Sequence, residues 1–217
     1  AGQLLEPIEE VVIDLDEEHQ GAVVQKLSER KADLIEMKPS GGGRVRLVFH
    51  APTRGLIGYQ SELLTDTRGT GIINRLFHGY APYKGPIQGR RNGVLVSTDQ
   101  GEAVAYALWN LEDRGPMMIE PGARVYQGMI VGEHTRGNDL DVNVLKGKKL
   151  TNIRTTSKDE AVRLTPPMRM VLEKALSYIQ DDELVEVTPE SIRLRKRHLD
   201  PNDRKKAERL RDAENAA

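Results

Sequence analysis

Along residues 44–51, apolar Val45, Leu47 and Phe49 alternate with polar or basic neighbours at nearly every second position. This period of two predicts a strand with one buried face. The same analysis of the first 80 residues predicts strand, helix, strand, strand, helix and strand in residues 4–15, 16–31, 33–37, 44–51, 53–67 and 71–80. The βαββαβ order is that of a ferredoxin-like fold, an antiparallel sheet with two helices on one face.

Turn-forming residues are concentrated in residues 81–86, so we expect a domain boundary near residue 85. The ferredoxin-like domain then occupies residues 1–85 and a second domain occupies residues 86–217. Patterning in the second domain predicts strands at 94–97, 103–108, 124–133, 183–187 and 191–195, one main helix at 165–179 with Pro166 and Pro167 at its start, and a terminal helix capped by Asp200. The expected fold class is α+β, with a mixed, strand-rich second domain.

Residues 135–157 show little regular periodicity. A structureless connection of this length inside a compact domain is usually functional or disordered. We therefore expect a long loop at 135–157. The loop is basic, because residues 142–158 contain five Lys or Arg and no Asp or Glu.

The 217-residue chain has a formal net charge of −1 at pH 7, but its charges are segregated. Residues 1–40 hold ten acids and four bases, whereas residues 193–211 hold nine bases and three acids. Such asymmetry favours a polyanionic partner for the basic loop and the basic tail. The alternative is that these charges simply face water.

Several classes of function are disfavoured by the sequence. The chain has no cysteine, no apolar run long enough to cross a bilayer and no signal-peptide core, so we expect a cytoplasmic protein without a membrane segment. It has no G-x-x-x-x-G-K-[ST] phosphate loop and no G-x-S-x-G elbow, and its five histidines are far apart in sequence. Because it begins Ala1-Gly2, we expect a piece of a longer protein.

Residues 143–154 join four bases and two amides on a glycine-containing loop, a composition suited to phosphate and sugar contacts with a nucleic acid. In the tail, Arg193, Arg195 and Arg197 alternate along a predicted strand and so form a basic stripe on one face, which Lys196 and His198 extend. Aromatic residues make up only 4% of the chain, so contacts to the backbone and shape of folded RNA fit better than base stacking. A solvated linker and a water-facing strand remain the alternatives.

Several motifs resemble those of known proteins. Residues 5–8 and 17–23 (Leu-Glu-Pro-Ile and Glu-Glu-His-Gln-Gly-Ala-Val) resemble the opening of domain V in elongation-factor-G-like translational GTPases. Residues 51–59, 67–71, 77–80, 113–115, 125–134 and 145–152 resemble the BipA/TypA branch in particular. The resemblance covers nearly the whole chain. It implies domain V followed by the C-terminal domain peculiar to that branch.

The resemblance also implies a function. Proteins of this branch are ribosome-associated and linked to stress adaptation and large-subunit assembly, and their C-terminal domain reaches toward the peptidyl-transferase region and A-site tRNA. The expected partners are therefore the ribosome, large-subunit rRNA and A-site tRNA. The expected contacts are Lys146, Lys148, Lys149, Asn152 and Arg154, supported by His134, Arg136 and Asn138, with Arg193, Arg195, Lys196 and Arg197 as second candidates.

The resemblance further implies that GTP and Mg²⁺ bind in an N-terminal domain outside this chain, so we expect no enzyme activity, no cofactor and a monomeric state for the chain itself. Two other classes of function stay open. A protein-interaction scaffold that uses the ferredoxin-like sheet would bind independently of salt and nuclease. A small hydrolase would need a cleft that holds carboxylates with shifted pKa values.

Overall fold

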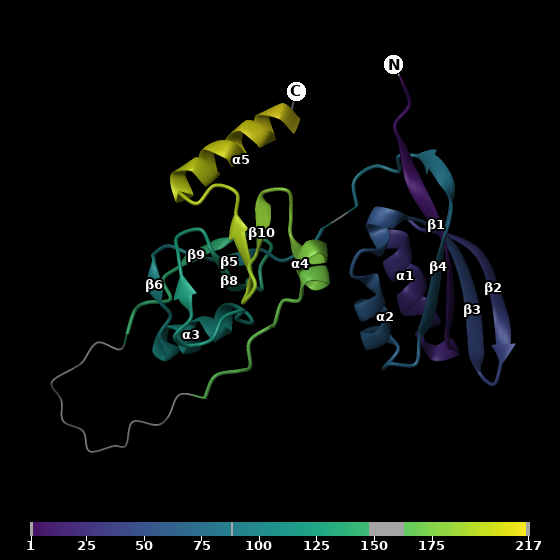
Figure 1. Cartoon of the computed structure of the whole chain (residues 1–217), viewed down its shortest axis with the longest axis horizontal. Helices are drawn as coiled ribbons and strands as arrows, with labels where there is room; N and C mark the ends of the chain where they lie inside the picture. Colours follow the sequence, from purple (N-terminus) through teal and green to yellow (C-terminus); the bar gives the residue numbers. More distant parts are fainter. Residues whose placement is uncertain (1, 88, 148–162, 216–217) are drawn as a thin grey trace. The chain divides into compact units, whose positions relative to one another are not determined.

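The computed structural model describes residues 2–87, 89–147 and 163–215. It forms two compact units, residues 1–88 (unit 1) and residues 89–217 (unit 2), which are drawn in Figure 1. Each unit has hydrophobic clusters of its own. The α+β class that the sequence predicts is confirmed.

Unit 1 has the predicted βαββαβ order and the ferredoxin-like arrangement. Its elements are β1 (Leu5–Asp16), α1 (Gln20–Glu29), β2 (Asp33–Gly41), β3 (Arg44–Pro52), α2 (Tyr59–Asp66) and β4 (Ile72–Pro82), with 3-10 turns η1 (Glu17–His19) and η2 (Thr53–Leu56). The antiparallel sheet has the order β2-β3-β1-β4. Both helices cover the same face of this sheet (Figure 1).

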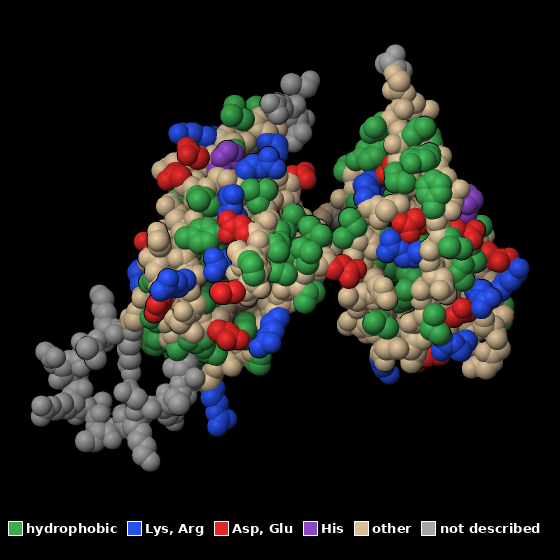
Figure 2. Space-filling view, viewed as in Figure 1, with side chains coloured by type: hydrophobic (Ala, Val, Ile, Leu, Met, Phe, Trp, Pro, Cys, Tyr) green, Lys and Arg blue, Asp and Glu red, His purple; other side chains and the backbone are tan. Residues whose placement is uncertain are grey.

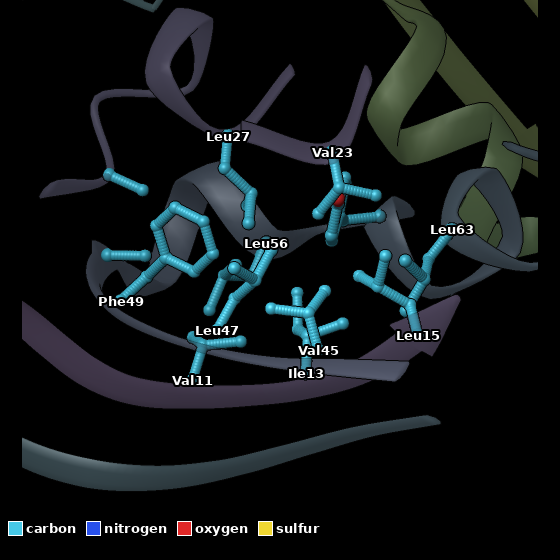
Figure 3. Close-up of a cluster of buried hydrophobic side chains, with 13 residues drawn as sticks. Val11, Ile13, Leu15, Val23, Leu27, Val45, Leu47, Phe49, Leu56 and Leu63 are labelled. Carbon is cyan, nitrogen blue, oxygen red and sulfur yellow. The ribbon is translucent and has the colours of Figure 1, made fainter. Parts of the chain in front are cut away.

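The core of unit 1 lies between the sheet and its helices. Alternate residues of β1 and β3 point into it, among them Val11, Ile13, Leu47 and Phe49, all fully buried. Figure 3 shows these side chains meeting Leu27 and its neighbours from the helical layer. The opposite face of the sheet carries the intervening residues and is not covered by α1 or α2 (Figure 1).

The second helix of unit 1 is shorter than the sequence predicts. In place of one helix over residues 53–67, the structure has η2, then a break, then α2. Gly58 forms the break with φ at +71°, a left-handed conformation that favours glycine. The break allows Leu56 and Tyr59 on its two sides to be buried together in the core.

Glu6 fastens the last residues of unit 1 to β1. Its buried carboxylate accepts hydrogen bonds from Arg54 Nε at 2.5 Å and from the backbone N–H of Lys84 at 2.8 Å. Arg54 also donates to the carbonyl of Gly85 at 2.6 Å. The hydrogen bond from Arg54, which outweighs burial, holds the pKa of Glu6 below its usual range.

We expect unit 1 to lose stability in acid as Glu6 becomes protonated. A carboxyl whose folded pKa is lowered contributes stability that is present above its unfolded pKa, about 4.3, and is lost as pH falls through the folded pKa. Glu6→Gln should lower the free energy of unfolding at neutral pH by about 1–2 kcal/mol and weaken this acid dependence. Urea titrations at several pH values, followed by amide NMR signals of unit 1, measure both effects; the exposed Glu17→Gln is the control. Parallel pH profiles for the wild type and Glu6→Gln would contradict the prediction.

Unit 2 is built from short strands, three α-helices and one 3-10 segment within its described residues. They are β5 (Val94–Ser97), β6 (Gly101–Glu102), α3 (Ala105–Leu111), η3 (Glu112–Arg114), β7 (Arg124–Val125), β8 (Ile130–Glu133), β9 (Leu140–Val142), α4 (Leu172–Tyr178), β10 (Glu183–Val187), β11 (Ile192–Lys196) and α5 (Pro201–Asn215). The sheets have the orders β8-β5-β9, β10-β11 and β6-β7. The predicted strands at 94–97, 183–187 and 191–195 are confirmed, as is the terminal helix.

Strand β5 is the centre of unit 2, and all of its residues are buried. Leu95 packs into one hydrophobic cluster with Leu108 of α3. Val94 and Val96 point to the other side of the sheet, into a cluster with Ala175 of α4. The β8-β5-β9 sheet is therefore covered on both faces, which explains why three successive residues of its central strand, 94–96, are apolar.

The predicted strand at 103–108 is wrong, because this segment enters α3. A short apolar run fits either a buried strand or one face of a helix. In the structure, Leu108 N–H donates to the carbonyl of Val104, and the helix buries Ala107 and Leu108 on one face. The predicted strand at 124–133 is likewise divided into β7 and β8 by a turn in which Gly128 has φ at +85°.

The main helix of unit 2 begins later than the two prolines indicate. The sequence predicts a start at Thr165, whereas α4 begins at Leu172. The backbone N–H of Met168 instead donates to the carbonyl of Met117 at 2.7 Å. This contact with another part of the chain holds the preceding residues outside the helix.

Candidate nucleic-acid interface

The N-terminal stem of the basic loop is anchored to unit 2. Asn143 donates to the carboxylate of Asp99 at 2.6 Å and accepts the backbone N–H of Leu145 at 2.9 Å. Val144 between them is fully buried. A Cβ added at residue 101 would lie only 2.2 Å from the Leu145 side chain. This packing therefore requires the glycine at position 101. The chain is thus fixed up to Leu145. The predicted long loop at 135–157 is therefore wrong in its first part, because residues 140–142 form β9 and pair with β5.

The C-terminal stem is anchored at a different place in unit 2. The backbone N–H of Thr165 donates to the carboxylate of Glu112, the first residue of η3, at 2.6 Å. Leu164 packs against the cluster beneath α3. Together with the Met168–Met117 backbone contact, these interactions fix the chain again from residue 164 onward.

Lys146 is exposed immediately after the N-terminal stem. Its backbone position is set by the buried Val144 two residues earlier, so its ammonium is directed to solvent from a fixed base. The other predicted contacts of the loop, Lys148, Lys149, Asn152 and Arg154, lie outside the described residues.

Residues 134–139 form a tight turn against the start of β5. His134 is buried, with Nδ1 2.5 Å from the carbonyl oxygen of Asn138, so its predicted role as a surface contact is wrong and its ring instead closes the turn. The carbonyl of Arg136 accepts the backbone N–H of Gly93 at 2.7 Å. The side chains of Arg136 and Asn138 are exposed, as a contact residue requires.

The predicted basic stripe on β11 is present in part. Arg193 and Arg195 are half-buried and Arg197 is exposed, while Leu194 lies on the buried side. The alternation is that of a strand with one face toward the core. By the same alternation, Lys196 falls on the side of Leu194.

The prediction that Lys196 extends the stripe is wrong. Lys196 is 1% exposed, and its ammonium lies 2.5 Å from Asp139, 2.9 Å from Asp182 and 2.8 Å from Glu183. Taking this group out of water costs several kcal/mol, and the three carboxylates offset the cost. Lys196 is therefore a structural cation that joins β11 to two neighbouring segments.

The arginines of the stripe have internal partners too. Arg195 Nε lies 2.8 Å from a carboxylate oxygen of Glu186, and the hydroxyl of Tyr126 donates to the other oxygen of that carboxylate at 2.5 Å. Arg197 donates to the backbone carbonyl of Asp181 at 3.2 Å. These contacts orient the guanidinium groups, but Glu186 partly neutralises Arg195, which makes the stripe a weaker anion site than the sequence predicts.

Helix α5 carries further basic residues that are not among the individual contacts predicted from the sequence. Asp200 caps the helix by accepting the N–H of Asn202 at 2.8 Å. Arg204 forms an ion pair with Asp141 on β9, whereas Lys205, Arg209 and Arg211 are exposed. The i, i+4 spacing of Lys205 and Arg209 in the sequence is the signal that could have identified them. Figure 2 shows acidic and basic side chains interspersed on the visible surface of unit 2.

Comparisons with known proteins match both units. Residues 3–91 match the model of the elongation factor G C-terminus, and residues 92–201 match the model of the TypA/BipA C-terminal domain. The second match alone covers half of the chain. The chain belongs to the BipA/TypA family.

Named relatives agree with this assignment. The chain is 56% identical over 209 residues to the large ribosomal subunit assembly factor BipA of Escherichia coli K12, 51% to that of Haemophilus influenzae and, over 207 residues, 50% to that of Bacillus subtilis. These alignments cover 95–96% of this chain and 34% of each relative. The chain therefore spans about a third of the length of these BipA proteins.

The BipA/TypA match contains both stems of the basic loop, the 134–139 turn and β11, and it ends at the first residue of α5. The contacts predicted from the sequence thus all lie in the domain that matches the BipA/TypA model, outside the residues that match elongation factor G. Among the described helices, none has the length and apolar character needed to span a bilayer.

The hydrolase alternative receives no support from Glu183, the most deeply buried carboxylate of unit 2. A general acid needs a raised pKa and access to substrate. Burial raises the pKa of Glu183, but hydrogen bonds from Arg90 and the charge of Lys196 outweigh it and lower the pKa overall. Both carboxylate oxygens accept hydrogen bonds from these two side chains.

Proposed function

We propose that the chain is the ribosome- and RNA-binding C-terminal region of a BipA/TypA translational GTPase. In this proposal, large-subunit rRNA and A-site tRNA bind at the basic loop, residues 135–157. The observation that carries the proposal is that the chain is fixed to unit 2 at Asn143 and again at Thr165. The acid-free basic run of residues 142–158 lies largely between these two points, and its first lysine, Lys146, is exposed. The family membership and the names of the BipA relatives support a ribosomal partner.

Phosphate recognition favours such an arrangement. Lysines that neutralise phosphates release condensed counterions, so binding gains entropy and depends strongly on salt. Since residues 142–158 contain no acid, their bases have no competing carboxylate within the segment. Fixed stems also reduce the conformational entropy that the loop loses when it binds. The exposed Arg136 offers a further cation from the adjacent turn.

Co-sedimentation with ribosomes across a salt series tests the proposal. We expect the wild-type chain to bind with strongly salt-dependent affinity. Replacing Lys146, Lys148 and Lys149 by alanine should reduce the slope of log K against log salt by about 2–3, because each lost phosphate contact removes roughly 0.7–0.9.

The matched control removes the same charge from another basic element: Lys205, Arg209 and Arg211 of α5 are replaced by alanine. Alanine is a good helix former, so α5 should persist. Binding that is lost in the loop variant and retained in the α5 variant supports the proposal. Equal binding by the wild type and the loop variant contradicts it and directs attention to the arginines of β11.

We further infer that GTP and Mg²⁺ act in the part of BipA-type proteins that this chain does not include. The chain itself then contributes positioning on the ribosome during subunit assembly and stress adaptation, as a monomer in the cytoplasm. Sedimentation equilibrium of the isolated chain and a GTPase assay of the chain alone test these two inferences, with a single monomeric species and no turnover as the expected results.

A protein partner on unit 1 is the second candidate. Strand β4 lies at one edge of the sheet and exposes large apolar side chains, with Leu76, Phe77 and Tyr80 each more than 60% accessible. Exposed apolar groups on an edge strand favour contact with another protein. Binding that resists both salt and nuclease would favour this function over RNA binding.

A further inference from the structure

The face of the unit 1 sheet that α1 and α2 leave uncovered carries a row of ligand-type side chains. On β3, Phe49 points to the core, so its neighbour His50 points to the open face. In the sheet register, His50 lies opposite Glu10 of β1 on one side and Asp33 of β2 on the other. Residues directly opposite each other in adjacent strands have side chains about 4.5–5.5 Å apart. Two carboxylates therefore flank one imidazole.

A β-bulge adds a second imidazole to this row. Between β1 and β4, Ile8 pairs with Gly79 and Glu9 pairs with Phe77, which leaves His78 as the extra residue on β4. A bulge redirects the side chain of the extra residue. Here His78 stacks on His50, with ring centroids 3.9 Å apart and planes inclined by 30°.

Three donor atoms converge at this point. One ligand atom each from Glu10, His50 and His78 lie within 4.8 Å of one another, and Glu10 Oε2 is 3.8 Å from His50 Nε2. A surface pocket of about 200 Å³, lined in part by His50, His78 and Asp33, opens beside them. Within the described residues, no hydrogen bond engages the ring nitrogens of either histidine. The three ligand atoms thus lie close together beside an open pocket, and among the described residues the imidazole nitrogens are free to bind an ion.

We propose that Glu10, His50 and His78 form a binding site for a divalent transition-metal ion of the Zn²⁺ type. Two imidazoles and one carboxylate suit Zn²⁺ or Co²⁺, whereas Mg²⁺ and Ca²⁺ prefer sites made of oxygen alone. Three protein ligands leave a fourth tetrahedral position toward the pocket for water. The ion bridges β1, β3 and β4 on the face of the sheet opposite α1 and α2.

The charges around the pocket suit a cation. Lys84 also lines the pocket, but its ammonium forms an ion pair with Asp33. This pair leaves the Glu10 carboxylate as the charge of the site, so a divalent ion meets one negative charge and two imidazoles. Distances of about 2.0–2.2 Å to each ligand require the three side chains to close slightly around the ion.

Calorimetric titration of the metal-free chain with ZnCl₂ tests the proposal. We expect one saturable Zn²⁺ site per chain, with no comparable binding of Mg²⁺. His50→Gln and His78→Gln should each weaken Zn²⁺ binding by at least tenfold, since loss of even an outer partner of a ligand typically costs about 10–100-fold. Co²⁺ gives a second readout through its visible absorption, which intensifies in a tetrahedral site.

His19→Gln is the matched control, because His19 also lies beside a carboxylate in unit 1, 3.2 Å from Glu18, but outside the three-donor cluster. It should bind Zn²⁺ as the wild type does. NMR signals of the wild-type histidine rings provide a test that needs no variant: Zn²⁺ should shift His50 and His78 and leave His19 and His134 unchanged. Absence of Zn²⁺ binding, or binding that survives in both His50→Gln and His78→Gln, overturns the proposal.

Discussion

Replacing Lys196 by alanine is expected to lower the free energy of unfolding of unit 2 by about 3–5 kcal/mol. The ammonium of Lys196 is enclosed by the carboxylates of Asp139, Asp182 and Glu183. Its removal would leave Glu183, itself 2% exposed, with Arg90 as its remaining ion-pair partner in the described structure. A buried charge that loses a partner retains its desolvation cost without the compensating attraction.

Both members of the central pair are charged at neutral pH. Burial lowers the pKa of Lys196, but the three surrounding carboxylates outweigh it and raise the pKa overall. Burial raises the pKa of Glu183, and Arg90 and Lys196 outweigh it in the opposite direction. The pair therefore keeps its charges in the folded state. After removal of the Lys196 side chain, Glu183 can become neutral only by taking up a proton, which itself costs free energy at neutral pH.

Urea denaturation followed by tryptophan fluorescence measures the effect, because the single tryptophan, Trp109, lies on α3 of unit 2. Arg195→Ala is the matched control. Arg195 is the adjacent residue of β11, but it is half-buried and pairs with Glu186 near the surface, so its loss should cost about 0–1 kcal/mol. If the two variants unfold at the same urea concentration, the buried network does not stabilise unit 2 as argued.

Gly93→Ala is expected to destabilise unit 2 by about 3 kcal/mol and to displace the 134–139 turn. A Cβ at residue 93 would lie 2.2 Å from the carbonyl oxygen of Asn138 and 2.3 Å from its carbonyl carbon. The same glycine exchanges backbone hydrogen bonds with Arg136 and His134 at 2.7 Å and 2.9 Å. Since the obstacle is backbone rather than a flexible side chain, the turn must move and these bonds weaken.

Trp109 fluorescence in urea gives the stability of this variant, and amide NMR signals of residues 134–139 report the displacement. Gly89→Ala is the control, because a Cβ there would meet only the side chain of Gln180 at 3.7 Å, an ordinary contact. Its stability should change by no more than about 0.5 kcal/mol. Unchanged signals from the turn in Gly93→Ala would show that the close approach can be relieved elsewhere.

The candidate interface contains residues that hold unit 2 together and residues that are free to contact RNA. Lys196 and His134 are basic or titratable residues of the predicted RNA surface, yet both are internal. Their loss should reduce ribosome binding only as far as it unfolds or distorts unit 2. Loss of Lys146 should reduce binding without a change in stability, because its side chain is exposed.

Much of unit 1 follows from sequence alone. The period-two alternation of Val45, Leu47 and Phe49 predicts β3 and its buried face, and the βαββαβ order follows from the same kind of pattern. Such patterns succeed because each element of this unit buries one face against one layer. The Asp200–Pro201 cap and the β10–β11 hairpin are local signals of the same kind, and the structure contains both.

In unit 2, the sequence determined the family and the basic character of residues 142–158, while tertiary contacts decided which residues face solvent. The short run at 103–108 is compatible with strand or helix, and its packing beneath β5 selects the helix. Lys196 is basic in any sequence analysis, but carboxylates 13, 14 and 57 positions away in the chain make it internal. Contacts between residues so distant in sequence leave no periodic signal, since they arise only when separate elements pack together.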